Sequence, residues 1–221
     1  MPLDFQFMKA QIPLFIQAAV LTLEIAFIGI LASIIIGIIN SIICYYRVKF
    51  LFGLVRTYVE VSRNTPLLIQ LFFLYFALPT FGIKLSGYSC AVIGLAFLGG
   101  GYMTEAFRAG IEAVSKNQIE AGLSIGLTDS KLMYYVILPQ AVGVAIPAIT
   151  ANCIFLLKET SIVSAVAVPE LLYTTNSLIA IYYKTYEMLL MLTVSYLILI
   201  LPISFLLSWA ERRVKYAQFG I

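Results

Sequence analysis

Three polar side chains lie inside the most apolar parts of the chain. Glu24 lies well within one apolar run, Glu159 ends another, and Asn152 precedes Glu159 by seven residues, or two helical turns. That spacing places Asn152 and Glu159 on one face of a helix. A charge at the centre of a membrane costs roughly 2.5 to 3.5 kcal/mol. Acids retained at that cost are suited to hold an ammonium group or another cation.

Each of these residues also has a structural interpretation. Glu24 could neutralise a base in a helix bundle, and Asn152 could bond across helices. Glu159 could pair with Lys158 or another span, or lie at the outer interface. Lys158 and Glu159 are adjacent, so their side chains diverge by about 100° on a helix and pair poorly with each other. Both interpretations stay open from the sequence alone.

The other potentially reactive residues do not suggest a catalytic site. Glu105, Arg108 and Glu112 stand at i, i+3 and i+7, so the arginine reaches both acids on one helix face. We favour a self-paired helix exit over a gate there. The chain has no histidine, which removes the usual general base and the commonest metal ligand. The three cysteines lie far apart in apolar runs and are interpreted as hydrophobic filler.

The composition predicts the class of protein that must position these residues. Of 221 residues, 62% are hydrophobic and only 11% are charged, whereas a soluble domain carries about a quarter charged residues. This excludes an ordinary soluble fold and predicts an all-α integral membrane protein. The first residues, MPLDFQFMKAQIP, have no basic segment and do not resemble a cleaved signal peptide. No linker or repeat stands out, so we expect one domain over residues 1–221.

Five apolar stretches are candidates for membrane-crossing helices, which need about 20 residues. They are residues 13–46, 66–78 with an approach helix from Leu51, 88–107, 140–157 and 186–209. Residues 160–183 are apolar but interrupted by Pro169, Asn176 and several hydroxyl residues. We expect either an outer loop or a partly re-entrant piece lined by protein, since irregular backbone survives at membrane depth only when it is so covered.

The basic residues predict the orientation. Ten of the 14 lysines and arginines fall on one side: Arg47, Lys49, Arg56 and Arg63 after the first span, Arg108, Lys116 and Lys131 after the third, and Arg212, Arg213 and Lys215 after the fifth. Because positive charge is enriched on the cytoplasmic side, we expect the N-terminus outside and the C-terminus in the cytoplasm. Arg63 is expected to anchor the second span at the cytoplasmic headgroups.

A polar stretch on the cytoplasmic side, at about residues 117–139, predicts two short helices at an angle. Asn117 can cap the first helix, with Glu120 three residues later in capping-box spacing. Gly126 can supply the left-handed residue that ends it. Residues 128–130 offer a new cap for a second helix over residues 131–138. A projecting helical turn of this kind is suited to a groove on another protein.

The spacing within this stretch resembles the EAA loop of ABC-importer permeases. The family's usual form is E-A-A, then G, then I-x-L-P, and here Gly122 stands where Ala is usual and Val136 where Ile is usual. The residues that carry the resemblance are Glu120, Ala121, Gly122, Gly126, Val136, Leu138 and Pro139.

Further segments resemble the polar amino acid branch of that family over nearly the whole length. RNTPLLIQLFF is similar to its R-G-T-P-L-L-x-Q-L-F-F segment, with Asn64 in place of Gly. LLKETSIVS is similar to its L-K-D-T-S-L-V-S segment, and AAVLTLEIAF to its G-A-x-x-T-L start. The resemblance implies the type I importer permease fold, with five membrane helices and a cytoplasmic EAA coupling helix.

The resemblance also implies the partners. The coupling helix would dock on an ABC ATPase present in two copies, and ATP binding would drive alternating access. We expect a second permease subunit, favouring a homodimer, an extracytoplasmic amino-acid-binding protein, and no nucleic acid. The chain has no G-x-x-x-x-G-K-[ST] motif, so no cofactor is expected in it, and ATP with Mg²⁺ would be bound by the ATPase. The run Gly99-Gly100-Gly101 lacks the following Lys and predicts close helix packing instead.

The substrate is the least determined part of the prediction. With a transporter implied, Glu24, Asn152 and Glu159 become candidate contacts, and two acids without histidine favour a cationic amino acid such as arginine, lysine or histidine. Glutamine or another neutral or acidic polar amino acid stays open, because the acids could serve the α-ammonium. An intramembrane enzyme lacks its motifs here. An ion-coupled secondary transporter would be unusual with five spans and no evident inverted repeat.

Overall fold

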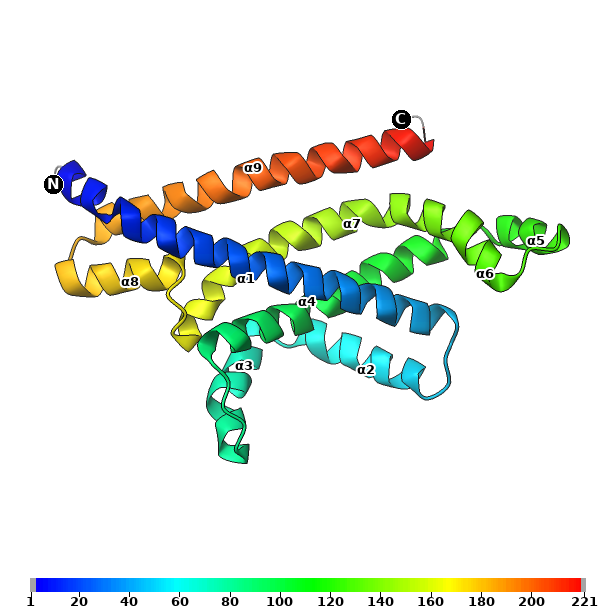
Figure 1. The fold of residues 1–221 in the computed structure, drawn as a ribbon, viewed down its shortest axis with the longest axis horizontal. Coiled ribbons are helices and arrows are strands. Elements are labelled where there is room, and N and C mark those ends of the chain that lie inside the picture. Colours follow the sequence, from blue (N-terminus) through cyan, green and yellow to red (C-terminus); the bar gives the residue numbers. More distant parts are fainter. Residues whose placement is uncertain (1–2, 220–221) are drawn as a thin grey trace. The chain divides into compact units, whose positions relative to one another are not determined.

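The computed structural model describes residues 3–219, and these are almost entirely helical (Figure 1). The described residues contain no strand, which confirms the all-α prediction. In chain order the elements are α1 (Phe5–Tyr45), α2 (Leu51–Asn64), α3 (Leu67–Phe72), η1 (Phe73–Ala77), η2 (Leu78–Phe81), α4 (Gly87–Glu112), α5 (Lys116–Ser124), α6 (Asp129–Leu132), η3 (Met133–Ile137), α7 (Leu138–Glu159), η4 (Thr160–Val166), α8 (Leu171–Tyr182) and α9 (Thr185–Phe219).

Within residues 3–219, four helical stretches are long and apolar enough to cross a membrane. They are α1, α4, the continuous stretch from α6 to η4, and α9. A fifth candidate is α2 followed by Leu67–Phe81, a pair that bends by 106°. Pro66 explains the bend, because a proline disfavours helical backbone at the residue before it, here Thr65. Four of the five predicted spans are confirmed in their positions, and α2 confirms the approach helix from Leu51. The second predicted span, residues 66–78, falls in the bent pair and stays a prediction.

The interrupted segment at residues 160–183 is two short helices rather than one span. The 3₁₀ helix η4 ends at Ala167, which has a left-handed φ of 56°. The helix α8 then begins after Glu170 and ends at Tyr183, which has a φ of 57°. Whether this segment is re-entrant stays a prediction.

The helices contribute to two compact units, each built from three pieces of the chain. Unit 1 comprises residues 3–31, 65–97 and 154–205, and unit 2 comprises residues 32–64, 98–153 and 206–219. The single-domain organisation stays a prediction.

In unit 1, apolar side chains of α1, α8 and α9 form a common core. Its buried members are Phe15, Ala18, Leu171, Leu178, Met188 and Met191. Elsewhere in the unit, α4 packs closely on α3 at Gly94, where a Cβ atom would lie 2.8 Å from Leu71 Cδ2. The missing side chain therefore allows the contact.

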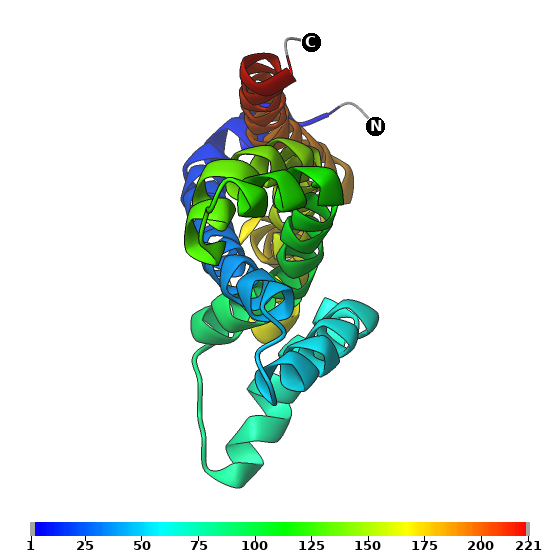
Figure 2. The ribbon, with the colours of Figure 1, turned by 90° about the vertical axis from the view of Figure 1, so that its right-hand side faces the viewer.

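In unit 2, glycines of α4 allow close helix contacts. A Cβ on Gly100 would collide with Ile36 of α1 and Tyr58 of α2, and one on Gly101 with Ser62 of α2. The prediction that the Gly99–Gly101 run serves helix packing is confirmed for these two glycines. A Cβ on Gly110 would collide with the backbone oxygen of Ala141 in α7. The turn from α1 into α2 and the α5–α6 hairpin, both in this unit, face the viewer in Figure 2.

The predicted helix starts in the hairpin are wrong by one or two residues. The N-cap of α5 is Ser115, with extended backbone, and Asn117 lies inside the first turn without capping it. The Ser115 carbonyl accepts hydrogen bonds from the Gln118 and Ile119 N–H groups. The first helical turn is therefore already closed at Ser115, two residues before Asn117. The helix α6 likewise begins at Asp129, behind Thr128.

Candidate functional site

Glu24 accepts a hydrogen bond from a tyrosine of unit 1. The Tyr88 hydroxyl, near the start of α4, donates to Glu24 Oε1 at 2.7 Å. Glu24 itself is exposed, although its neighbours Ile25 and Ala26 are buried. It forms no ion pair within residues 3–219. The carboxylate is therefore oriented by a neutral donor, and no base in the described part of the chain neutralises it.

Glu159 ends α7 in unit 1 and is half-buried. No ion pair joins it to the exposed Lys158, in keeping with the divergence of adjacent side chains on a helix. The structure thus gives no support to a Lys158–Glu159 pair within the described chain.

Asn152, in unit 2, makes a contact between helices. Its Nδ2 donates to the backbone oxygen of Tyr102 in α4 at 3.3 Å. This bond between helices is the structural alternative considered for Asn152. It uses the side-chain NH₂ group of the amide. The side-chain oxygen of Asn152 is left for another donor.

The α5–α6 hairpin owes its turn to Gly126, whose φ is +84°. The Leu127 N–H donates to the Gly122 oxygen at 3.1 Å, and the Gly126 N–H donates to the Leu123 oxygen at 3.0 Å. These two bonds form a Schellman motif, which satisfies the last carbonyls of α5. The prediction that Gly126 supplies the left-handed residue is confirmed.

The hairpin is held on its inner side by an apolar core that α5, α6 and η3 share with α4 and α7. Its buried members are Val114, Leu132, Ile137 and Ala141. Gly122 belongs to this inner side, since a Cβ there would lie 2.5 Å from Leu132 Cδ1. An alanine, which is usual at this position in the family, would collide with the Leu132 side chain as it lies here. Glycine avoids that collision.

The outer side of the hairpin combines apolar and acidic groups. Leu123 is 48% exposed and Ile125 is 79% exposed, and Glu120 and Ala121 are also exposed. Large apolar side chains that are exposed to solvent next to a carboxylate, on a short polar hairpin, are typical of a docking surface.

At the junction with α7, Leu138 and Pro139 follow a π-helical turn, η3. A wider turn accommodates a proline, which lacks the N–H that a regular helix needs. The Gln140 side chain donates to the Val136 oxygen at 2.8 Å and satisfies that carbonyl. The hairpin therefore continues into α7 without a flexible break.

Arg108 pairs with both acids on its own helix. Its Nη2 lies 2.7 Å from Glu105 Oε2 and its Nη1 lies 2.6 Å from Glu112 Oε1, which confirms the self-paired helix exit. Arg63 of α2 adds a longer contact, 3.6 Å from Nη1 to Glu105 Oε2. Its guanidinium also lies over the Tyr102 ring, 5.4 Å from the centroid.

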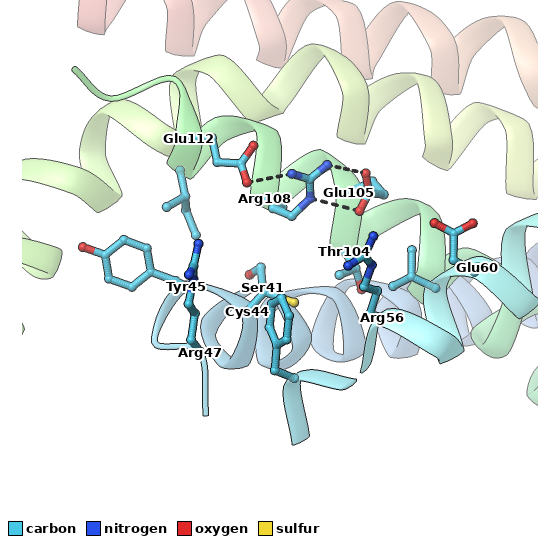
Figure 3. Close-up of a pocket in the computed structure, with 13 residues that line it drawn as sticks. Ser41, Cys44, Tyr45, Arg47, Arg56, Glu60, Thr104, Glu105, Arg108 and Glu112 are labelled. Carbon is cyan, nitrogen blue, oxygen red and sulfur yellow. Dashed lines mark hydrogen bonds and ion pairs between the residues drawn. The ribbon is translucent and has the colours of Figure 1, made fainter. Parts of the chain in front are cut away.

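A cavity of about 470 Å³ lies beside this network in unit 2 (Figure 3). The end of α1, the turn after it, α2 and the end of α4 form its walls. Three arginines and three glutamates line it: Arg47, Arg56, Arg108, Glu60, Glu105 and Glu112. Among the residues described, no three His, Cys, Asp or Glu side chains are grouped to hold a metal ion.

The comparison with protein families decides what kind of molecule these features belong to. Residues 29–216 match the family described as "Binding-protein-dependent transport system inner membrane component". The chain belongs to this family. The protein is thus a membrane permease subunit, a transport component rather than an enzyme, and its relatives work with a separate ATPase and a binding protein.

Curated relatives of the permease confirm the resemblance to the amino acid branch. The permease is 32% identical over 220 residues to the probable amino-acid ABC transporter permease PatM of Vibrio harveyi, covering 98% of this chain and 99% of the relative. It is 32% identical to the arginine transport permease ArtQ of Bacillus subtilis, covering 97% and 99%. It is 31% identical to the glutamine permease GlnP of Escherichia coli K12, with the same coverage.

Solved structures confirm the fold of the permease. A crystal structure of an amino acid ABC transporter with histidines matches with a TM-score of 0.90 and 34% identity, covering 96% of this chain and all of that one. The inward-facing methionine transporter MetNI matches with a TM-score of 0.78 at 21% identity, covering 93% and 98%, and this likeness shows the fold alone. The type I importer permease fold is confirmed.

Glu170 of the permease was not identified from the sequence. It is fully buried and caps α8, its carboxylate accepting hydrogen bonds from the Leu172 and Tyr173 N–H groups at 2.9 and 2.7 Å. The Tyr196 hydroxyl of α9 donates to the same carboxylate at 3.2 Å. Burial raises the pKa of Glu170 to about 7. The sequence offers one signal for this cap, namely an acid that lies between Pro169 and an apolar run. That signal is weak, because glutamate is not among the preferred N-cap residues.

Proposed function

We propose that the permease carries a polar amino acid across the inner membrane into the cytoplasm by alternating access, with energy from ATP hydrolysed on a partner. The names of the relatives support an amino acid as the substrate class. The spacing of Glu120, Gly126 and Pro139 and the exposed outer side of the hairpin support coupling to an ATPase. ATP and Mg²⁺ are held by that partner, and this chain needs no cofactor of its own.

One observation carries the choice of a cationic amino acid. Glu24 is an exposed carboxylate inside an apolar helix, oriented by Tyr88 and without an ion-pair partner among residues 3–219. Its charge costs roughly 2.5 to 3.5 kcal/mol in lipid unless a cation or water meets it. The ammonium or guanidinium of arginine, lysine or histidine offsets that cost. Glu159 is a second acid of the same unit, and Asn152 keeps its side-chain oxygen for the substrate.

The second candidate function is glutamine import by the same machinery. It is favoured by relatives of comparable similarity: the E. coli GlnP at 31% identity, and a probable glutamine permease GlnP of Bacillus subtilis at 37% identity over 70% of this chain. In that case Glu24 binds the α-ammonium that every amino acid carries.

The assembly and orientation are part of the proposal. The hairpin docks in a groove of the ATPase, which places α5 and the basic residues of unit 2 in the cytoplasm and the N-terminus outside. Two copies of this permease, two ATPases and one outer binding protein form the transporter. The exposure of Glu24 supports a second permease copy, because one chain leaves this carboxylate uncovered.

The test is ATPase activity of the assembled permease, ATPase and binding protein in lipid, titrated with arginine, lysine, histidine and glutamine. We expect cationic amino acids to stimulate, and Glu24→Gln and Glu159→Gln to abolish the preference. Glu211→Gln is the matched control, since Glu211 pairs with Lys215 on α9 and makes no substrate contact in this proposal. Stimulation by glutamine alone would leave the importer and remove the cationic substrate. Uptake driven by an ion gradient without ATP would refute the importer.

A further inference from the structure

The cavity of unit 2 contains two arginines whose charges are not balanced by an ion pair. Arg47 lies in the turn after α1 and Arg56 lies on α2. Neither guanidinium forms an ion pair with an acid in residues 3–219. Figure 3 shows both side chains extending into the cavity toward the Arg108 network.

The charge of the cavity can be counted from its contacts. Arg108 and Arg63 balance Glu105 and Glu112. One further acid, Glu60, also lines the cavity, and its Oε2 accepts a hydrogen bond from Asn64 Nδ2 at 3.1 Å. The cavity with its flanking Arg63 thus carries one net positive charge. A ligand with a single negative charge would neutralise it.

The surroundings of the cavity point to a ligand with apolar tails. Phe50 is 81% exposed, and Leu51 and Leu54 of α2 are 42% and 53% exposed. Phe52 and Val59 of the same helix line the cavity itself. A helix with exposed apolar side chains on one side and arginines on another is typical of the membrane interface. A helix of this kind lying in the interface would place the mouth of the cavity where headgroups and acyl chains meet.

We propose that this cavity binds the phosphodiester of an anionic phospholipid of the cytoplasmic leaflet, with Arg47 and Arg56 as its ligands. Basic pockets between membrane helices on this side recognise anionic headgroups, and a guanidinium binds phosphate through paired N–H groups. A singly charged headgroup such as phosphatidylglycerol matches the one positive charge that is left when the flanking Arg63 is counted with the cavity lining. The assignment to the cytoplasmic leaflet rests on the orientation in the proposed function.

The bound lipid also stabilises the base of the coupling hairpin. Tyr45 is a wall of the cavity and at the same time packs against the hairpin core of Val114, Leu132, Ile137 and Ala141. Ile111 has the same double position. Occupancy of the cavity therefore supports side chains on which the hairpin rests, and substrate-stimulated ATP hydrolysis depends on it.

The experiment uses the assembled transporter in nanodiscs of phosphatidylcholine with an increasing fraction of phosphatidylglycerol. Native mass spectrometry measures the lipid that stays bound, and ATP hydrolysis is measured on the same samples. One basic residue near a charged surface contributes about a fivefold change in affinity. We expect R47Q and R56Q each to weaken phosphatidylglycerol retention about fivefold, and the double variant about thirtyfold. The matched control is R212Q/R213Q, which removes two arginines of unit 2 outside the cavity.

Each outcome distinguishes a lipid bound in the cavity from surface attraction or from a soluble anion. Retention lost equally in R212Q/R213Q would mean general surface attraction and would overturn the proposal. Displacement of the lipid by millimolar inorganic phosphate, with activity restored in pure phosphatidylcholine, would assign the site to a soluble anion instead. If the double variant does not assemble, the wild-type protein decides, because equal retention of both lipids refutes the site. Lipid retention is measured without transport, so it can succeed even if no amino acid stimulates the permease.

Discussion

The left-handed backbone of Gly126 provides a sharp test of how the coupling hairpin is held. An L-residue in left-handed helical conformation costs roughly 1 to 2 kcal/mol, and Gly126 has a φ of +84° with open space around a hypothetical Cβ. Gly126→Ala therefore changes only the backbone preference. Alanine also restricts the unfolded chain, which offsets about 0.4 to 1 kcal/mol. The net expectation is about 1 kcal/mol of local destabilisation at the end of α5.

Amide hydrogen exchange of the assembled transporter measures this effect directly. A loss of about 1 kcal/mol corresponds to roughly fivefold faster exchange, and we expect it at the Gly126 and Leu127 amides, which close the Schellman motif. Gly126→Asn should exchange more slowly than Gly126→Ala, because asparagine tolerates this backbone region.

Gly53 is the matched control, since a Cβ there also meets open space but its backbone is an ordinary turn of α2. Gly53→Ala should stabilise its helix by up to about 1 kcal/mol, because alanine is the better helix former. Unchanged exchange in Gly126→Ala, or the same sign for both variants, would refute the claim that Gly126 is required by its backbone conformation.

Three further predictions concern buried or paired polar groups. Tyr88→Phe removes the donor to Glu24, and we expect the apparent substrate affinity in the ATPase titration to fall several-fold while protein yield is unchanged; an unaltered affinity would disconnect this pair from transport. Burial raises the pKa of Glu170 from its ordinary 4.5 to about 7. The free energy of unfolding should therefore fall as the pH rises from about 4.5 to 7 and stay level above that, because the folded state must then hold a buried charge. Glu170→Gln should remove this pH dependence from the thermal unfolding temperature. Arg108→Gln should cost about 1 kcal/mol or less, since its ion pairs are partly exposed, and 1 M salt should shrink the difference between variant and wild type.

Features within one helix could be predicted from the sequence, since they depend on local spacing. The long apolar runs gave the positions of α1, α4, α7 and α9, and the i, i+3, i+7 pattern around Arg108 predicted its pairs. Gly126 was identifiable as a helix end because few other residues accept its backbone. The start of α5 was misplaced, because several polar residues in a row can each serve as an N-cap.

Contacts between helices could not be predicted, because periodicity defines a face without naming its partner. Tyr88 and Glu24 are 64 positions apart, and Arg63 and Glu105 meet across α2 and α4. Tyr196 reaches Glu170 from another helix. Each pairing depends on the crossing of two helices, which in unit 2 depends on glycine contacts such as Gly101 on Ser62. A single sequence contains no signal for these distances.

The exposure of Glu24 links the fold to the assembly. Ile25 and Ala26 are buried at 0% and 3%, so this part of α1 is packed in unit 1 on one side only. On its other side the carboxylate would face lipid if the permease acted alone, at a cost of roughly 2.5 to 3.5 kcal/mol. A neighbouring subunit or a water-filled path removes that cost, and a path is what a transporter requires.

If Glu24 lines such a path, a cysteine at position 24 reacts with a water-soluble thiol reagent in the assembled transporter and is protected by bound substrate. A cysteine replacing Phe27, which is 68% exposed and lies one turn further along the same helix, should react more slowly and gain no protection from bound substrate. Equal labelling at both positions would place Glu24 outside the transport path and leave its cost in the membrane to be explained by its bond with Tyr88.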